Sequence, residues 1–195
     1  MSDTMVFEDA FNGVMANEWG WLREEPEAWE LVEGALRILA LPGTLWGPRN
    51  DARNVLLRPA LPLTDGMNSQ VTVSNRPAIQ GEQGGLIWFV DEANYVKLVK
   101  ECLDGSVWIV LAREEADQGT LVSRIPFTGD TARLRLSLSG DTMVGQVQAA
   151  PDAEWQTVGM CAKAATAQAQ LGICVHGGPA DEAHWAELSA FAIQS

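Results

Sequence analysis

Residues Gly84–Glu101 read GGLIWFVDEANYVKLVKE and predict two β-strands joined by a tight turn. The first half is a continuous apolar run, and the Asp-Glu-Ala-Asn segment that follows it is typical of a turn. Side chains alternate between the two faces of a strand. One face of the second strand therefore carries Tyr95, Lys97, Val99 and Glu101. Two opposite charges on that face indicate either a structural brace at a solvated surface or the lining of a binding groove.

Short alternating runs of the same kind continue along the chain. Residues 131–138 read TARLRLSL, in which the leucines fall on one face and the arginines on the other. About a dozen such runs, separated by turn sequences, are typical of a β-sandwich or barrel. The first and last runs, at residues 6–11 and 187–193, are expected to pair, because that leaves fewer open sheet edges. The sequence therefore predicts an all-β fold, and its 195 residues suit one domain over 1–195.

The composition limits the classes of partner. The formal net charge of −13 disfavours both nucleic acid and anionic membrane surfaces, whose own negative charge would be repelled. A small neutral or cationic ligand remains compatible with it. No segment approaches the ~20 apolar residues of a membrane span. The N-terminal stretch also lacks the basic and apolar regions of a signal peptide.

The number and spacing of the cysteines indicate the redox state of the compartment in which the protein is found. Cys102, Cys161 and Cys174 are odd in number and form no CxxC pair. We therefore expect buried free thiols in a reducing environment, and a cytoplasmic location for the chain.

Several segments, taken in order, resemble a known family: FEDAFNG at residues 7–13, WGWLREEPEAWEL at 19–31, RNDARNVLLR at 49–58 and FAI at 191–193. The most specific part is a Gln-Gly-Leu strand, a turn and an aromatic-x-Lys-x-x-x-Glu strand, matched here by Gln83, Gly85, Leu86, Tyr95, Lys97 and Glu101. The pattern resembles the DUF1349 family of concanavalin A-like β-sandwiches, and it is similar to the accessory sandwich domain at the C-terminus of family 43 β-xylosidases. The resemblance implies a two-sheet antiparallel β-sandwich, a jelly roll of the concanavalin A type. It also implies a bowed sheet with an outer groove, which in related sandwiches often binds a sugar chain.

A second polar set comes from the strand NVLLR at residues 54–58. Alternation places Asn54 and Arg58 on one face, and the other face carries Val55 and Leu57. If the two apolar residues enter the core, the two polar ones join the charged face of the 94–101 strand. Amide and guanidinium groups suit sugar hydroxyls because they offer several hydrogen bonds in fixed geometry. The alternative is that Arg58 only pairs with a surface acid.

Tryptophan is the most abundant aromatic residue, with eight copies against one tyrosine. Indole rings stack on the apolar CH face of a pyranose, although most tryptophans of a sandwich belong to the core. Trp21, Trp46 and Trp88 are the candidates for a groove, Trp46 because of its loop-like GTLWGP setting. The predicted ligand-binding residues are Trp21, Arg49, Asn54, Arg58, Trp88, Lys97 and Glu101.

Catalysis and metal binding have weaker support. The adjacent glutamates at 24–25 and at 114–115 point to opposite faces of a strand, so neither pair forms a two-carboxylate site within one strand. His176 and His184 lack the spacing of a metal-binding motif. No cofactor is predicted, although a structural calcium ion at Asp9, beside the paired chain ends, stays open.

Three hypotheses follow for the function. The leading one is a non-catalytic β-sandwich that binds carbohydrate or another small polyhydroxylated ligand. The second is a glycoside-acting enzyme that uses Glu25 or Glu101, which would need two groove carboxylates ~5–10 Å apart. The third is an interaction or regulatory domain with an exposed apolar patch or a two-fold homodimer surface.

Overall fold

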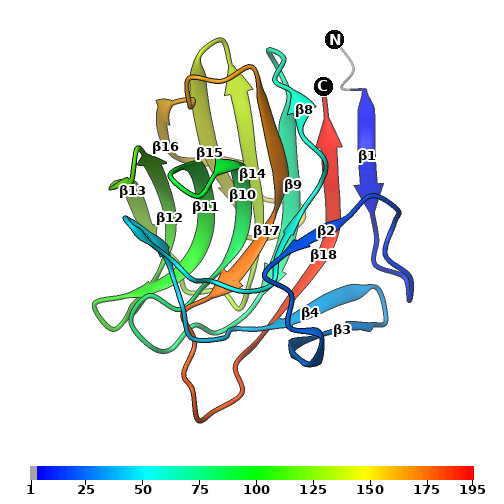
Figure 1. Cartoon of the computed structure of the whole chain (residues 1–195), viewed down its shortest axis with the longest axis vertical. Helices are drawn as coiled ribbons and strands as arrows, with labels where there is room; N and C mark the ends of the chain where they lie inside the picture. The colour runs from blue at the N-terminus through cyan, green and yellow to red at the C-terminus, as the bar shows by residue number, and fades with distance from the viewer. Residues whose placement is uncertain (1–3) are drawn as a thin grey trace.

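The computed structural model describes residues 4–195 and contains two antiparallel β-sheets packed face to face (Figure 1). The predicted all-β, two-sheet antiparallel sandwich is confirmed. The first three residues of the predicted domain 1–195, which also begin the stretch examined for a signal peptide, lie outside the described range. Within residues 4–195, no helix has the length and hydropathy that crossing a membrane requires.

The first sheet contains both ends of the described chain. In order across the sheet, its strands are β16 (Gln156–Ala162), β15 (Thr142–Gln148), β14 (Thr131–Ser139), β9 (Asn68–Ser74), β18 (Trp185–Gln194), β4 (Ala35–Leu39) and β3 (Trp29–Val32), and β1 (Met5–Asp9) also pairs with β18. The predicted pairing of the first and last runs is confirmed, with Phe7 opposite Ile193. Thr4 and Ser195 exchange backbone hydrogen bonds of 2.7 and 3.0 Å. The two chain ends therefore lie side by side (Figure 1).

The second sheet contains the predicted hairpin. In order, its strands are β13 (Gln118–Pro126), β12 (Ser106–Glu115), β11 (Asn94–Leu103), β10 (Gln83–Asp91), β17 (Gln168–His176), β7 (Val55–Leu57) and β2 (Gly20–Leu22), and β8 (Leu61–Pro62) also pairs with β17. β10 and β11 pair as predicted, with Gln83 opposite Glu101. The remaining elements are a small hairpin of β5 (Leu45–Trp46) and β6 (Arg49–Asn50), and a single 3-10 turn, η1 (Pro26–Ala28).

The core between the sheets follows from strict alternation. From the first sheet it receives the leucines predicted on one face of β14, and from the second sheet the inner face of β10 and β11. These residues are Leu134, Leu136, Leu138, Leu86, Trp88, Val96 and Leu98, each at most 3% exposed. Full burial of one such side chain contributes about 1.5–3 kcal/mol. This core accounts for the face-to-face packing of the sheets.

A second, smaller apolar cluster lies on the outer face of the second sheet. Leu45 and Ala52, from the segment before β7, belong to the same cluster as Ile87, Val99 and Val110 of β10, β11 and β12. The chain between β4 and β7 therefore folds back over part of the outer face. It leaves the neighbouring part of that face open.

The orientation of β7 is opposite to the predicted one. Leu56 enters the core between the sheets, whereas Val55 and Leu57 belong to the outer cluster. The strand has only three residues, all apolar and all buried, so its pattern carries no information about which face is wet. Asn54, which precedes it, has φ = 53° and does not continue the alternation of the strand.

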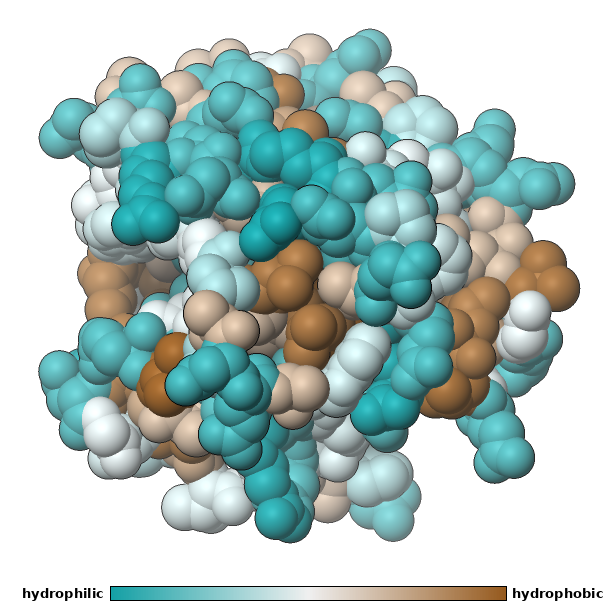
Figure 2. Space-filling view, turned by 60° about the horizontal axis from the view of Figure 1, so that its bottom comes forward, coloured by the Kyte–Doolittle hydropathy of each residue, from teal (hydrophilic) through white to brown (hydrophobic). Residues whose placement is uncertain are grey.

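The face of the molecule in Figure 2 carries many hydrophilic residues, in keeping with the net charge of −13. On the face shown in Figure 2, hydrophobic residues form separate small areas among hydrophilic ones. Two of the large hydrophobic side chains exposed among residues 4–195 are Trp46 and Leu121, at 41% and 44%. Both line the pocket described next.

Candidate functional site

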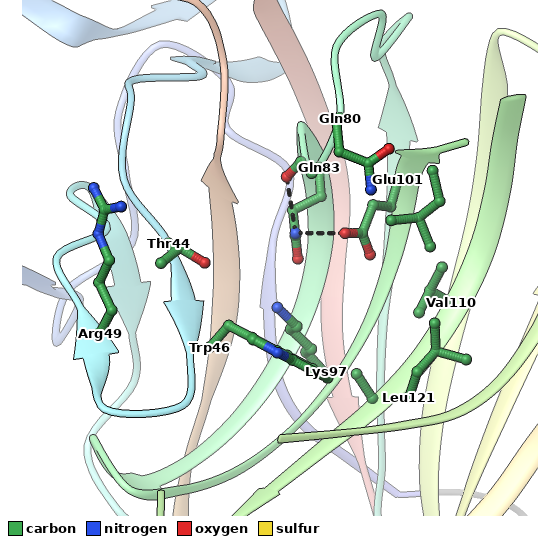
Figure 3. Close-up of a pocket in the computed structure, with 12 residues that line it drawn as sticks. Thr44, Trp46, Arg49, Gln80, Gln83, Lys97, Glu101, Val110 and Leu121 are labelled. Carbon is green, nitrogen blue, oxygen red and sulfur yellow. Dashed lines mark hydrogen bonds between the residues drawn. The ribbon is translucent and has the colours of Figure 1, made fainter. Parts of the chain in front are cut away.

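A pocket of ≈ 430 Å³ lies between the β5–β6 hairpin and the outer face of the second sheet (Figure 3). Ligand sites in proteins usually measure about 300–1,000 Å³, so one small ligand fits its size. The lining residues come from the hairpin, from β10 to β13 and from the loop before β10. They are Thr44, Trp46, Arg49, Gln80, Gly81, Gln83, Lys97, Glu101, Leu103, Val110, Ala112 and Leu121.

One end of the pocket is polar and nearly buried. Gln83 Nε2 donates hydrogen bonds to Glu101 Oε1 at 3.1 Å and to the carbonyl oxygen of Gly81 at 3.0 Å (Figure 3). Within residues 4–195, the buried Gln83 Oε1 has no hydrogen-bond partner. Burial raises the pKa of the Glu101 carboxyl, and the charge of Lys97 partly opposes that rise. This end therefore presents acceptors that a ligand hydroxyl would satisfy.

Lys97 occupies the middle of the pocket floor and is only 2% exposed. Its Nζ donates to the carbonyl oxygen of Leu45 at 3.0 Å and lies 5.5 Å from the centre of the Trp46 ring. Burial lowers the pKa of the Lys97 amine, and the nearby Glu101, Cys174 and Glu114 act in the opposite direction. The amine therefore contacts the hairpin through the carbonyl of Leu45 and lies close to the indole of Trp46.

Lys97 and Glu101 share a face, as predicted, but they do not form a direct brace. Four residues along one strand span ~13 Å, and within residues 4–195 no ion pair joins the two side chains. Each charge instead contacts a different wall, Lys97 the hairpin and Glu101 the glutamine of β10. Between their two rows the pocket is lined by Val110 of β12, which lies opposite the fully buried Val99 of β11.

Trp46 is positioned by a glycine on the far wall. A Cβ atom added to Gly119 of β13 would lie 2.6 Å from Cε2 of the indole, closer than any side chain tolerates. The absence of a side chain there lets the ring lie against the strand. The hairpin itself is held by Asp51, which accepts hydrogen bonds from the Thr44 amide at 2.8 Å and from Arg49 Nε at 3.0 Å. These contacts hold the pKa of the Asp51 carboxyl below its usual value, the Thr44 amide contributing most.

The other end of the pocket is apolar. Ala112 lies opposite Lys97 on β12, and Leu121 lies opposite Ala112 on β13. Val110 stands between this row and the row of Glu101. In Figure 3 the side chains of Gln83 and Glu101 lie at one end and those of Trp46 and Leu121 at the other. The pocket is therefore divided into a polar and an apolar half.

Three of the seven predicted ligand-binding residues lie in this pocket. They are Arg49, Lys97 and Glu101. The side chain of Arg49 is 71% exposed at the rim and forms an ion pair with Asp51. Of the tryptophans weighed as groove candidates, Trp46 is the one that lines the pocket.

The other four predicted residues lie elsewhere, so the expectation of one shared polar surface is wrong. Asn54 is fully buried and caps the 25–28 turn, accepting from the Glu25 amide at 2.7 Å. Arg58 stacks on the Phe7 ring, its guanidinium carbon 3.7 Å from the ring centre. Trp88 lies in the core between the sheets, where its indole N–H donates to Ser69 Oγ at 2.7 Å, and Trp21 packs on Trp29 with ring centres 5.0 Å apart.

Some lining residues were not predicted from the sequence, and they differ in whether the sequence contains a signal for them. Gln83 is part of the motif quoted above, and the hairpin register places it opposite Glu101, so it could have been found. Leu121 and Gln80 carry no sequence signal, because their place in the pocket depends on how β13 and the 79–82 loop approach β11.

Metal binding gains no support from the geometry. The two Asp9 oxygens accept hydrogen bonds from the Phe11 and Ala16 amides and from Trp19 Nε1, at 2.7–2.8 Å. In the described part of the chain, no cluster of three His, Cys, Asp or Glu side chains could hold a metal ion. Asp9 thus ties the 10–19 segment to the end of β1, and the described residues place no ligand cluster around it for the calcium ion that the sequence left open.

The sequence model of one protein family, described as the β-xylosidase C-terminal concanavalin A-like domain, matches residues 8–172. The chain belongs to this family. The predicted concanavalin A-like fold and its relation to family 43 β-xylosidases are thus confirmed, while the DUF1349 resemblance stays a prediction. No curated protein sequence matches the chain significantly.

Solved structures share the fold at low sequence identity. The GH43 protein BlXynB from Bacillus licheniformis superposes with a TM-score of 0.82 at 16% identity, over 95% of this chain and 38% of that one. A xylan β-1,4-xylosidase from Bacillus halodurans gives 0.81 at 15% identity, over 96% of this chain and 39% of that one. A functionally unknown protein from Saccharomyces cerevisiae gives 0.71 at 14% identity, over 90% and 95%. The chain therefore spans less than half the length of these two Bacillus proteins and nearly the whole yeast protein.

Proposed function

We propose that this family member is a non-catalytic carbohydrate-binding domain whose sugar occupies the pocket between the β5–β6 hairpin and the second sheet. The observation that carries the proposal is an exposed indole beside buried polar groups. Trp46 is 41% exposed at the pocket, and within residues 4–195 the buried Gln83 Oε1 lacks a partner. A sugar combines an apolar CH face with hydroxyl groups, so it suits both features.

In this proposal the polar residues share the hydroxyls of the sugar. Gln83 Oε1 and the Glu101 carboxyl accept hydrogen bonds from hydroxyl groups of the sugar, and Lys97 Nζ donates a hydrogen bond to a hydroxyl oxygen. Arg49 at the rim adds donors that remain accessible despite its ion pair with Asp51. A neutral ligand of this kind is also compatible with a net charge of −13.

The relatives support a sugar ligand and supply the first probes. The family description names β-xylosidase, and one structural relative is a xylan β-1,4-xylosidase. Because the chain covers only 39% of that relative, the activity of the whole protein is not transferred to this chain. Xylose-containing ligands are therefore probes for binding and are the first to be tried.

A glycoside-acting enzyme is the second candidate, because burial raises the pKa of Glu101, as a general acid requires. Hydrolysis with two carboxylates needs a second acid within ~10 Å. Among the residues that line the described pocket, Glu101 is the only acid. Glu25, the other predicted acid, is paired with Arg53 at 2.9 Å and lies outside the lining. We therefore favour binding without catalysis.

The test is a glycan panel that includes xylo- and arabino-oligosaccharides, followed by calorimetry on each ligand found. Trp46→Ala should weaken binding at least about tenfold, since one stacked ring contributes ~1.4 kcal/mol or more. The matched control is Trp155→Ala, which removes an indole that packs on Arg135 of the first sheet at 4.2 Å.

Two outcomes would contradict the proposal. One is a panel without any glycan that binds. The other is a ligand whose affinity depends on Trp155 and is unaffected by Trp46→Ala. Release of reducing sugar by the wild type, lost in Glu101→Gln, would instead establish the enzyme.

A further inference from the structure

The apolar half of the pocket indicates which kind of substituent the bound sugar has. This inference rests on the proposed function and concerns the ligand class of the same pocket. Ala112, Val110 and Leu121 line one side, and Trp46 lines the other. Leu121 and Trp46 are both substantially exposed, so the protein leaves two large apolar side chains uncovered at one place. An occupant with apolar surface would remove both from water.

The length of the floor shows that one sugar ring leaves this half empty. The row of Gln83 and Glu101 lies ~13 Å along β11 from the row of Lys97 and Ala112, at 3.3 Å per residue. A pyranose bonded to Gln83 and Glu101 therefore ends before it reaches Leu121. The remaining space is open to a second group attached to the sugar.

The chemistry of the wall decides between a second sugar and an apolar group. Hydroxyls of a second sugar would face Ala112, Val110 and Leu121, whose side chains offer no hydrogen bond. The one polar group in this row, the Lys97 amine, already donates to the carbonyl of Leu45, so most of these hydroxyls would lose water without compensation. An aromatic ring there would contact the same aliphatic groups and the Trp46 indole. The Lys97 ammonium, 5.5 Å from the Trp46 ring centre, would also lie near the face of such a ring.

We propose that the pocket binds a glycoside with an aromatic substituent. The sugar is bonded to Gln83, Glu101 and Lys97 Nζ and touches the near edge of the Trp46 indole, and the aromatic ring lies between the rest of that indole and Leu121. The polar half sets the orientation of the sugar. The apolar half provides the preference for the substituent. The ligand class is therefore aryl glycosides, or sugars with an aromatic group linked close to the ring.

The experiment compares matched pairs by calorimetry: phenyl and methyl glycosides of xylose, arabinose and glucose, with xylobiose as the two-sugar competitor. For the sugar that binds, the phenyl glycoside should bind about tenfold more tightly than the methyl glycoside, because the ring adds buried apolar area. Xylobiose should bind no more tightly than methyl xyloside.

Two surface variants separate the apolar half from general effects on the fold. Leu121→Asn should reduce the ratio of the phenyl-glycoside affinity to the methyl-glycoside affinity from about tenfold to about threefold or less. Met160→Asn is the matched control, since Met160 is also a large apolar side chain, 61% exposed on β16 of the first sheet, and its replacement should change neither affinity.

The outcomes distinguish this inference from the proposed function. If xylobiose or the methyl glycoside binds as tightly as the phenyl glycoside, the aromatic preference is wrong and the carbohydrate site stands. If the phenyl preference survives Leu121→Asn, the ring does not lie where we place it and the inference fails. If no glycoside or oligosaccharide binds, both proposals fail.

Discussion

The two faces of the β10–β11 hairpin differ in role: the inner face packs in the core between the sheets, and the outer face lines the pocket. The inner face presents Leu86, Trp88 and Leu98, which pack against the first sheet, and the one polar atom among them, the indole N–H, is bonded to Ser69. The outer face presents Gln83 and Lys97, buried just as deeply, with polar atoms that the described protein satisfies only in part.

The two faces differ in how completely neighbouring segments satisfy their side chains. An apolar face is satisfied by any close-packed apolar neighbour, whereas a buried polar group needs a partner in a defined direction. On the outer face the β5–β6 hairpin covers only part of the sheet and provides one carbonyl, that of Leu45, to Lys97. The unfilled hydrogen-bonding capacity remains next to an open pocket, which is why we assign the ligand to this face.

The largest expected effect tests the inner face. Leu98→Ala removes a fully buried side chain from the core and should lower the free energy of unfolding by about 2–5 kcal/mol. Chemical denaturation followed by circular dichroism measures it. Sugar affinity should be retained under conditions where the variant is folded. A loss below about 1 kcal/mol would mean that the sheets do not pack there as tightly as described.

A smaller effect on stability, with a large one on binding, is expected on the outer face. Lys97→Met replaces a buried amine by an apolar chain of similar size, so the free energy of unfolding should change by no more than about 1 kcal/mol. Sugar affinity should fall at least about tenfold, because the donor to the ligand is gone.

Lys163→Met, which removes a surface ion pair with Asp141, is the control and should affect neither quantity measurably. Strong destabilisation by Lys97→Met would show that Lys97 is a structural brace after all. The assignment of the ligand to the outer face would then lose its support from Lys97.

The smallest effect is a pH dependence of stability. Burial lowers the pKa of Lys97 below the 10.5 of a free lysine, so between the lowered pKa and 10.5 the unfolded chain binds more protons than the folded one. Stability of the wild type should therefore increase relative to Lys97→Met as the pH is raised towards 10.5. Denaturation curves of both proteins over this range measure the difference. A constant or shrinking difference would place Lys97 in a more solvated setting.

Much of the fold could be predicted because strand alternation is a local property. The inward leucines of β14, the hairpin of β10 and β11, and the shared face of Lys97 and Glu101 were all correct. The reasoning failed at β7, where three consecutive apolar residues are buried on both faces of the sheet. It failed there because alternation identifies a face only when one side is polar.

The sequence by itself determined the all-β class, the main hairpin and the separation of an apolar from a charged face on β11, since each depends on neighbours two residues apart. Only the tertiary structure decided which other residues meet that charged face. Gln83 reaches Glu101 through strand register, Trp46 reaches Lys97 because a hairpin folds back over the sheet onto Gly119, and Arg58 and Trp88 are drawn to other surfaces. The physical reason is that side-chain direction within a strand is set locally, whereas the covering of a sheet face is set by packing between segments distant in sequence.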